Sequence, residues 1–160
     1  MSTTVPTPRV AYTSEEITTS EVTRSAKYKW VIAIDTAVPT GRATNAVACI
    51  AATTGALVEG LIARGGRDAT GHFHPGLPWA GCSVLAGTAA DLASAHARAT
   101  GSEGVLVVDM PAAAQTHRIY DDYLKELAST ASSDLGLCAF SIIGPRNRVD
   151  KIVKKLTLLP

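Results

Sequence analysis

Two histidines lie close together in the middle of the chain and could transfer protons. His72 and His74 are separated by one residue within the glycine- and proline-rich stretch 59–81. Because the imidazole pKa lies near neutrality, histidine suits acid–base catalysis, so we predict that His74 is catalytic and His72 binds substrate. Zinc needs three or four ligands, and the nearby Cys82 does not complete such a set, so we predict no metal. The alternative is that both histidines belong to a solvated loop.

Two carboxylates end apolar runs that are typical of buried strands. Asp35 ends the run 29–35, and Asp109 ends the run 104–109. If these strands are parallel neighbours, both carboxylates emerge at the carboxyl edge of the sheet, where α/β proteins form clefts. Two nearby carboxylates can share a proton or bind a cation, so we predict a catalytic Asp109 and a substrate-binding Asp35. Equally, each carboxylate can cap the turn that follows it.

A helix N-terminus is predicted directly after the first of these strands, from Gly41 onward. Its free backbone N–H groups carry partial positive charge and suit an anionic or carbonyl oxygen. The side chains beside them are Thr40, Arg42, Thr44 and Asn45, and with Gly41 they form our predicted substrate-binding wall. Alternatively, threonine and asparagine cap the helix, and the arginine is solvated.

Two further polar residues follow the strand at 104–109. Gln115 and His117 could reach the same sheet edge as Asp109, so we predict substrate binding by Gln115 and proton transfer by His117. For His117 the alternative is a helix-start or surface residue. His96 lies in an alanine-rich helical segment and is interpreted as structural. No phosphate-binding loop, dinucleotide fingerprint or serine-nucleophile motif is present, and we predict no cofactor.

Strands alternating with helices must position these residues. Apolar runs predict strands at about 29–35, 82–86, 104–109 and 136–143, and helical spacing predicts helices from Gly41 to Val58, at 88–100, at 116–129 and from about Asn147 onward. This alternation predicts an α/β three-layer sandwich, in which a four-stranded, mostly parallel mixed sheet has helices on both faces. The helix at 116–129 is expected to bury a stripe that includes Tyr120, Tyr123 and Leu124.

Length and composition indicate one folded domain behind an N-terminal arm. The 160 residues are 46% apolar, and the net charge of +1 argues against bulk electrostatic binding of nucleic acid. Residues 1–26 contain 11 Ser and Thr, so we predict a flexible arm that Tyr12 and Ile17 could dock on a neighbour, and a domain at 27–160. Three cysteines, interpreted as small core residues, indicate a reducing compartment. With no signal peptide or membrane span evident, we predict a cytoplasmic protein.

Both ends of the domain resemble a known family. Tyr-Lys-Trp-Val-Ile-Ala-Ile at 28–34, followed by Thr-Gly-Arg-Ala at 40–43, resembles the opening of the type II peptidyl-tRNA hydrolases, and 143–159 resembles their closing segment. The middle, including His-Pro-Gly at 74–76 and Val-Val-Asp-Met at 107–110, is similar to a bacterial branch of that superfamily of unknown function. The resemblance covers about 27–160 and implies a four-stranded mixed sheet between helices, and often a homodimer.

The resemblance also implies a substrate. It suggests that the protein binds a small-molecule or tRNA-linked acyl substrate, such as peptidyl- or aminoacyl-tRNA, and hydrolyses or transfers the acyl group. Arg42 would hold the carbonyl oxygen, and His74 or His117 would transfer the proton. However, the places of the family's lysine, glutamine and histidine are occupied by Thr44, Ala48 and Ala51. The alternatives are therefore a non-catalytic binding or regulatory protein, or a small-molecule enzyme of a specialised pathway that uses the loop at 72–74.

Overall fold

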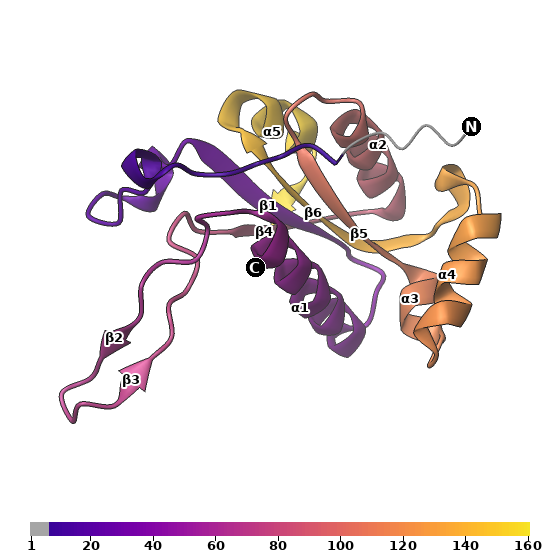
Figure 1. The fold of residues 1–160 in the computed structure, drawn as a ribbon. Coiled ribbons are helices and arrows are strands. Elements are labelled where there is room, and N and C mark those ends of the chain that lie inside the picture. Colours follow the sequence, from indigo (N-terminus) through magenta and orange to yellow (C-terminus); the bar gives the residue numbers. More distant parts are fainter. Residues whose placement is uncertain (1–6) are drawn as a thin grey trace.

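A five-stranded mixed sheet forms the centre of the computed structural model, which describes residues 7–160. The strand order is β5-β6-β1-β4-β7 (Figure 1). The strands are β1 (Tyr28–Asp35), β4 (Ser83–Gly87), β5 (Leu106–Pro111), β6 (Leu137–Pro145) and β7 (Thr157–Leu158). Within this sheet β1 and β4 pair in parallel, whereas β1–β6, β5–β6 and β4–β7 are antiparallel.

The predicted α/β class and mixed sheet are confirmed, but the predicted four strands and their mostly parallel pairing are wrong. The additional strand, β7, has two residues and is too short to give a periodic signal. Between β5 and β6 lie α3 (Ala112–Thr116), α4 (Tyr120–Ser129) and the 3₁₀ turn η3 (Ser132–Asp134). This connection returns at the same end of the sheet without crossing a face, so β6 runs antiparallel to β5.

Helices cover both faces of the sheet, as predicted. On one face α1 (Thr40–Leu57) packs on β5, β6 and β1. On the other face α2 (Ala89–Thr100) and α5 (Arg146–Val153) pack on β6 and β1 and on each other. The strand β1 is therefore buried on both sides, which explains its unbroken apolar run.

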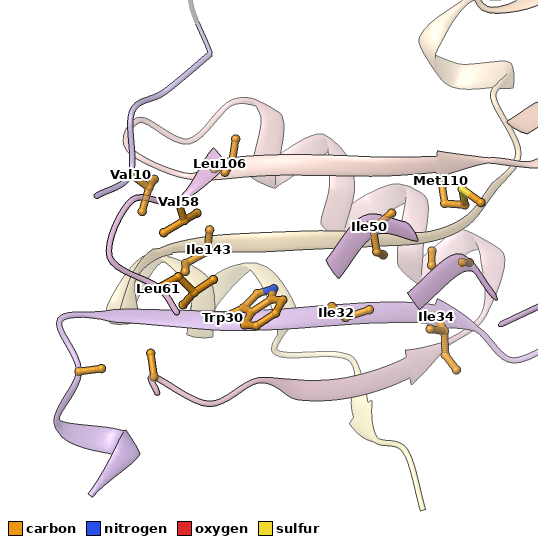
Figure 2. Packing of buried hydrophobic residues seen from close by; sticks show 14 of the residues in the cluster. Val10, Trp30, Ile32, Ile34, Ile50, Val58, Leu61, Leu106, Met110 and Ile143 are labelled. Carbon is orange, nitrogen blue, oxygen red and sulfur yellow. The ribbon is translucent and has the colours of Figure 1, made fainter. Parts of the chain in front are cut away.

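Alternation along β1 divides its side chains between the two cores. Trp30, Ile32 and Ile34 lie in the α1 core (Figure 2), whereas the residues between them lie in the core beneath α2 and α5. The α1 core contains a polar chain: the Trp30 indole N–H donates to Ser141 Oγ at 2.8 Å. Ser141 Oγ lies 2.8 Å from Thr54 Oγ1, which donates to the Ile50 carbonyl at 2.7 Å. All the donors of this buried chain have acceptors.

The N-terminal segment differs from the predicted flexible arm, as far as it is described. Residues 7–26 include the 3₁₀ turns η1 (Ser14–Glu16) and η2 (Thr23–Ser25), and Val10 is buried in the α1 core. The Tyr12 ring packs edge-on against Tyr28 and Trp79, with ring centroids 5.1 and 5.0 Å away. Tyr12 therefore packs on its own domain and helps to bury the side chains that it contacts there. The first six residues of the predicted arm lie outside the described part.

The glycine- and proline-rich stretch 59–81 is a projecting hairpin instead of an irregular loop. Its strands β2 (Gly66–Arg67) and β3 (Phe73–His74) pair antiparallel, and an isolated bridge joins Ile62 to Pro78 nearer the body. In Figure 1 the hairpin extends away from the sheet on the side opposite α3 and α4. Gly71 has φ +87°, a backbone conformation that favours glycine in the turn.

Two expected burials are wrong. The helix α4 has no buried residue, and the Tyr120 and Leu124 side chains that were expected inside are 71% and 42% exposed. The reason is that α4 packs mainly on the short helix α3 at the end of the sheet and covers neither face. Of the three cysteines, Cys49 and Cys82 are exposed, and Cys138 alone is a core residue. Within residues 7–160, no helix is long and apolar enough to cross a membrane.

Candidate functional site

A cavity of about 940 Å³ opens at the end of the sheet where β1 stops. Its walls are the turn after β1, the first turn of α1, one side of α2, the start of α3 and the segment 132–138. The wall is mainly apolar, because several alanines of α2 face it. Asp35, Arg42, His96 and Cys138 bring polar groups to this wall. An apolar pocket with a few convergent polar groups is typical of a small-molecule site.

His96 lines this cavity and pairs with a carboxylate behind it, Asp109, which does not line it. His96 Nε2 lies 2.8 Å from Asp109 Oδ1, and the two side chains are 13% and 32% exposed. The His96 ring also packs edge-on against Phe140. With Nε2–H donating to the carboxylate, neutral His96 keeps the lone pair of Nδ1, for which no hydrogen-bond partner exists within the described chain. The pair therefore has the arrangement of a general base oriented by a carboxylate.

The helix α2 positions His96 because its N-terminus is capped and one of its faces is buried. Its N-cap Thr88 accepts from the backbone N–H of Asp91, whose carboxylate accepts in return from Thr88, as a capping box. Leu92, Ala95 and Ala99 are buried against the sheet. His96 lies between this buried face and the cavity, which brings it over β5 and Asp109.

Hydrogen bonds with Gln115 hold Arg42 at the cavity. Arg42 Nε donates to Gln115 Oε1 at 3.1 Å, and Gln115 Nε2 donates to the Arg42 carbonyl at 2.8 Å. The same Nε2 lies 3.1 Å from Asn45 Oδ1. Three of the predicted substrate-binding residues thus meet, and they join α1 to α3. The remaining guanidinium nitrogens of Arg42 have no partner in residues 7–160 and can donate to a ligand oxygen.

Asp35 and Cys138 also line the cavity. Asp35 Oδ1 accepts from the Ala37 backbone N–H at 2.9 Å, which is the turn-capping role proposed as its alternative. Burial raises the pKa of the Cys138 thiol, the Arg42 charge opposes that rise, and the Asp35 charge adds to it. The thiol therefore stays protonated at neutral pH, which does not suit a nucleophile.

The other predicted wall residues of α1 lie beside the cavity without lining it. Thr44 Oγ1 donates to the Thr40 carbonyl at 2.8 Å along the helix. A Cβ on Gly41 would meet nothing within 4 Å, so no close approach requires glycine there. The role of these three residues in substrate binding stays a prediction.

The predicted catalytic histidines are not brought together. His74 Nε2 lies 3.1 Å from Asp68 Oδ2 in the projecting hairpin, and the His72 ring packs edge-on against it. His117 Nε2 lies 2.5 Å from Glu126 Oε2, which links the end of α3 to α4. None of the three histidines lines the cavity. The hairpin that carries His72 and His74 therefore forms no part of the cavity wall.

His96 is a candidate site residue that the sequence did not single out. Its alanine-rich helix was interpreted as structural packing. A signal was nevertheless present, because Ala89, Ala93 and Ala97 repeat every four residues and form one small-residue stripe beside His96. Such a stripe leaves space above a helix. Within the described chain, no group of three or more His, Cys, Asp or Glu side chains could hold a metal ion.

Comparisons with known proteins place the fold but no activity. Residues 28–160 match the family model described as protein of unknown function (DUF2000). A solved structure of a protein of unknown function from Agrobacterium tumefaciens strain C58 matches with a TM-score of 0.75 and 17% identity, over 84% of this chain and 98% of that chain. At this identity the likeness shows the fold alone. No curated protein matches the chain.

Proposed function

Because the chain belongs to the DUF2000 family, whose function is unknown, we propose a function from the chemistry of the cavity beside His96. The cavity binds an acyl- or amide-linked substrate, and the protein hydrolyses it or transfers its acyl group. The observation that carries this proposal is the pair of His96 and Asp109, 2.8 Å apart, in which His96 lines an apolar cavity that Arg42 also lines.

The proposed reaction gives each of these groups a role. His96 Nδ1 takes a proton from a water or an acyl acceptor as its oxygen attacks the carbonyl carbon. Asp109 stabilises the imidazolium that forms, and Arg42 donates hydrogen bonds to the carbonyl oxygen as it gains negative charge. The imidazolium then returns the proton to the leaving oxygen or nitrogen as the bond to the acyl carbon breaks. Oriented acid–base catalysis of this kind contributes roughly 10²–10⁴-fold.

We propose peptidyl- or aminoacyl-tRNA as the first substrate to test. The support is the resemblance of residues 28–34 and 143–159 to type II peptidyl-tRNA hydrolases. A panel of small acyl esters and amides should accompany it, because the cavity of about 940 Å³ can hold a small acyl group by itself. Binding of these compounds without turnover would favour the alternative of a non-catalytic binding protein.

The decisive experiment compares histidine variants on whichever substrate is turned over. We expect His96→Gln to lower kcat by at least about 100-fold and Asp109→Asn to lower it by a smaller factor, because the imidazole remains in place. His74→Gln tests the site expected from the sequence. If that site is catalytic, this substitution should lower kcat; if the His96 site is catalytic, it should leave kcat unchanged. Full activity of His96→Gln, or loss of activity in His74→Gln alone, would refute the proposal.

We also propose that two copies associate through α4. The support for this association is a group of exposed apolar side chains on α4 and its N-cap, Ile119, Tyr120 and Leu124. Exposed apolar patches commonly mark interaction surfaces. Light scattering after gel filtration should give twice the chain mass for the wild type and one chain mass for Tyr120→Lys. A monomeric wild type at micromolar concentration would contradict this.

A cytoplasmic location is likewise proposed. All three cysteines are free, and Cys49 and Cys82 are exposed residues, which suits a reducing compartment. Thiol labelling of intact cells and of lysates should give labelling after lysis alone.

A further inference from the structure

A second cavity, of about 400 Å³, lies where β1 and β4 begin. Three cationic side chains line it, Arg24, Lys29 and Arg146, and no acidic residue does. The hydroxyl residues Thr23 and Ser83 also line it. Positive charges repel one another, so a polar cavity that collects three cations and no carboxylate suits an anionic ligand.

The count of charges indicates what kind of anion fits. Lys29 Nζ already pairs with Asp150 Oδ1 at 2.5 Å, and Asp150 does not line the cavity. Within residues 7–160, neither Arg24 nor Arg146 forms an ion pair with a carboxylate. Two positive charges at the cavity therefore lack a counter-charge from the protein. A phosphate monoester, which carries about −1.5 to −2 at pH 7, matches them.

Arg146 is held ready for such a ligand. Its Nε donates to the Ala26 carbonyl at 2.8 Å, and one terminal nitrogen donates to the Thr23 carbonyl at 3.2 Å. These bonds fix the plane of the guanidinium and leave the other terminal nitrogen without a partner in the described chain. A guanidinium fork fixed in this way suits phosphate oxygens.

We propose that this cavity binds a small phosphate monoester as a dianion, held by Arg24, Lys29 and Arg146. The site is separate from the acyl cavity, because Lys29 and Asp35 lie near opposite ends of β1, about 20 Å apart at about 3.3 Å per residue. A small ligand cannot reach both. The bound phosphate would connect Arg24 of the N-terminal segment to Lys29 of the sheet, and so would tie that segment to the domain.

Calorimetric titration of the full-length protein tests the site with defined probes. Glycerol 2-phosphate should bind at pH 7.5, whereas dimethyl phosphate at the same ionic strength should not, because a diester carries a single charge. Affinity for the monoester should fall between pH 7 and pH 5 as the phosphate gains its second proton, near pH 6. Equal binding of the two probes, or of an oligonucleotide without a terminal phosphate, would overturn the assignment of a monoester.

Two variants separate this site from general surface charge. Arg24 is an exposed residue of a 3₁₀ turn, so Arg24→Ala should keep the fold and weaken monoester binding at least about tenfold. Lys154→Ala removes an exposed charge just after the end of α5 that does not line the cavity, and should leave binding unchanged. Equal affinities of the wild type and Arg24→Ala, with circular dichroism showing both folded, would refute the proposal.

Discussion

The buried polar chain from Trp30 to Thr54 allows a sharp test of the core. In this chain the Trp30 N–H donates to Ser141, Ser141 Oγ contacts Thr54 Oγ1, and Thr54 donates to the Ile50 carbonyl. Ser141→Ala removes one oxygen atom and leaves the buried indole N–H without an acceptor. An unsatisfied buried donor costs about 1–3 kcal/mol, so we expect the free energy of unfolding to fall by that amount. For a chain of this size the melting temperature should fall by about 2–4 °C per kcal/mol.

The second variant, Thr54→Val, keeps the shape of the side chain but removes the acceptor of the Ser141 hydroxyl. Alone it should destabilise by about 1 kcal/mol or more, because the Ser141 O–H is then unpaired. In the background of Ser141→Ala it should cost less, since that hydroxyl is already absent. The double variant should therefore be more stable than the sum of the single effects predicts, by about 1 kcal/mol.

Urea unfolding followed by circular dichroism and by tryptophan fluorescence measures these values. The matched control is Ser129→Ala, which removes an exposed hydroxyl on α4 and should change the stability by less than about 0.5 kcal/mol. If Ser141→Ala unfolds within 0.5 kcal/mol of the wild type, the indole N–H has found another partner. Strict additivity of the two substitutions would likewise refute the chain of shared hydrogen bonds.

Two further predictions concern the hairpin and the N-terminal segment. A Cβ on Gly76 would lie 1.7 Å from the Ala63 carbonyl oxygen, so Gly76→Ala should destabilise the hairpin. A Cβ on Gly66 would meet nothing within 4 Å, so Gly66→Ala should not. The rates at which a protease cuts the hairpin in the two variants measure the difference. Burial raises the pKa of Tyr12 to about 12 from an ordinary value near 10, and its hydroxyl has no hydrogen-bond partner within residues 7–160. The stability that depends on neutral Tyr12 is therefore complete below pH 10 and is lost between pH 10 and 12. Unfolding at these pH values should show a steeper loss for the wild type than for Tyr12→Phe, and parallel curves would contradict the burial.

Local patterns in the sequence predicted the elements better than their assembly. The apolar run of β1 and the capping box at Thr88 and Asp91 each depend on neighbouring residues, so both were predictable. Whether a connection crosses a face depends on where its helices pack, and the apolar spacing of α4 did not reveal that α4 stays at the end of the sheet. The mostly parallel pairing of the sheet was therefore predicted wrongly.

The candidate site, too, could be predicted from the sequence only in part. Arg42 and Gln115 were predicted at one edge because each follows a strand that ends there, and they do meet. His96 lies on α2 and Asp109 lies on β5. No local sequence pattern indicates that these two side chains meet, so their pairing could be found only in the folded chain. His74 lies in a hairpin whose turn residues are visible in the sequence, but the direction in which a hairpin projects is set by the packing at its base.

The position of β6 affects how the protein folds during synthesis. This strand pairs with β1 on one side and with β5 on the other, yet it is the last long strand to be made. The hydrogen bond between Trp30 and Ser141 closes over 111 positions of chain. Until β6 leaves the ribosome, the apolar strands β1 and β5 each lack the partner that lies between them. A nascent chain that stops before β6 therefore exposes two open strand edges, which makes it a substrate for chaperones and a source of aggregation.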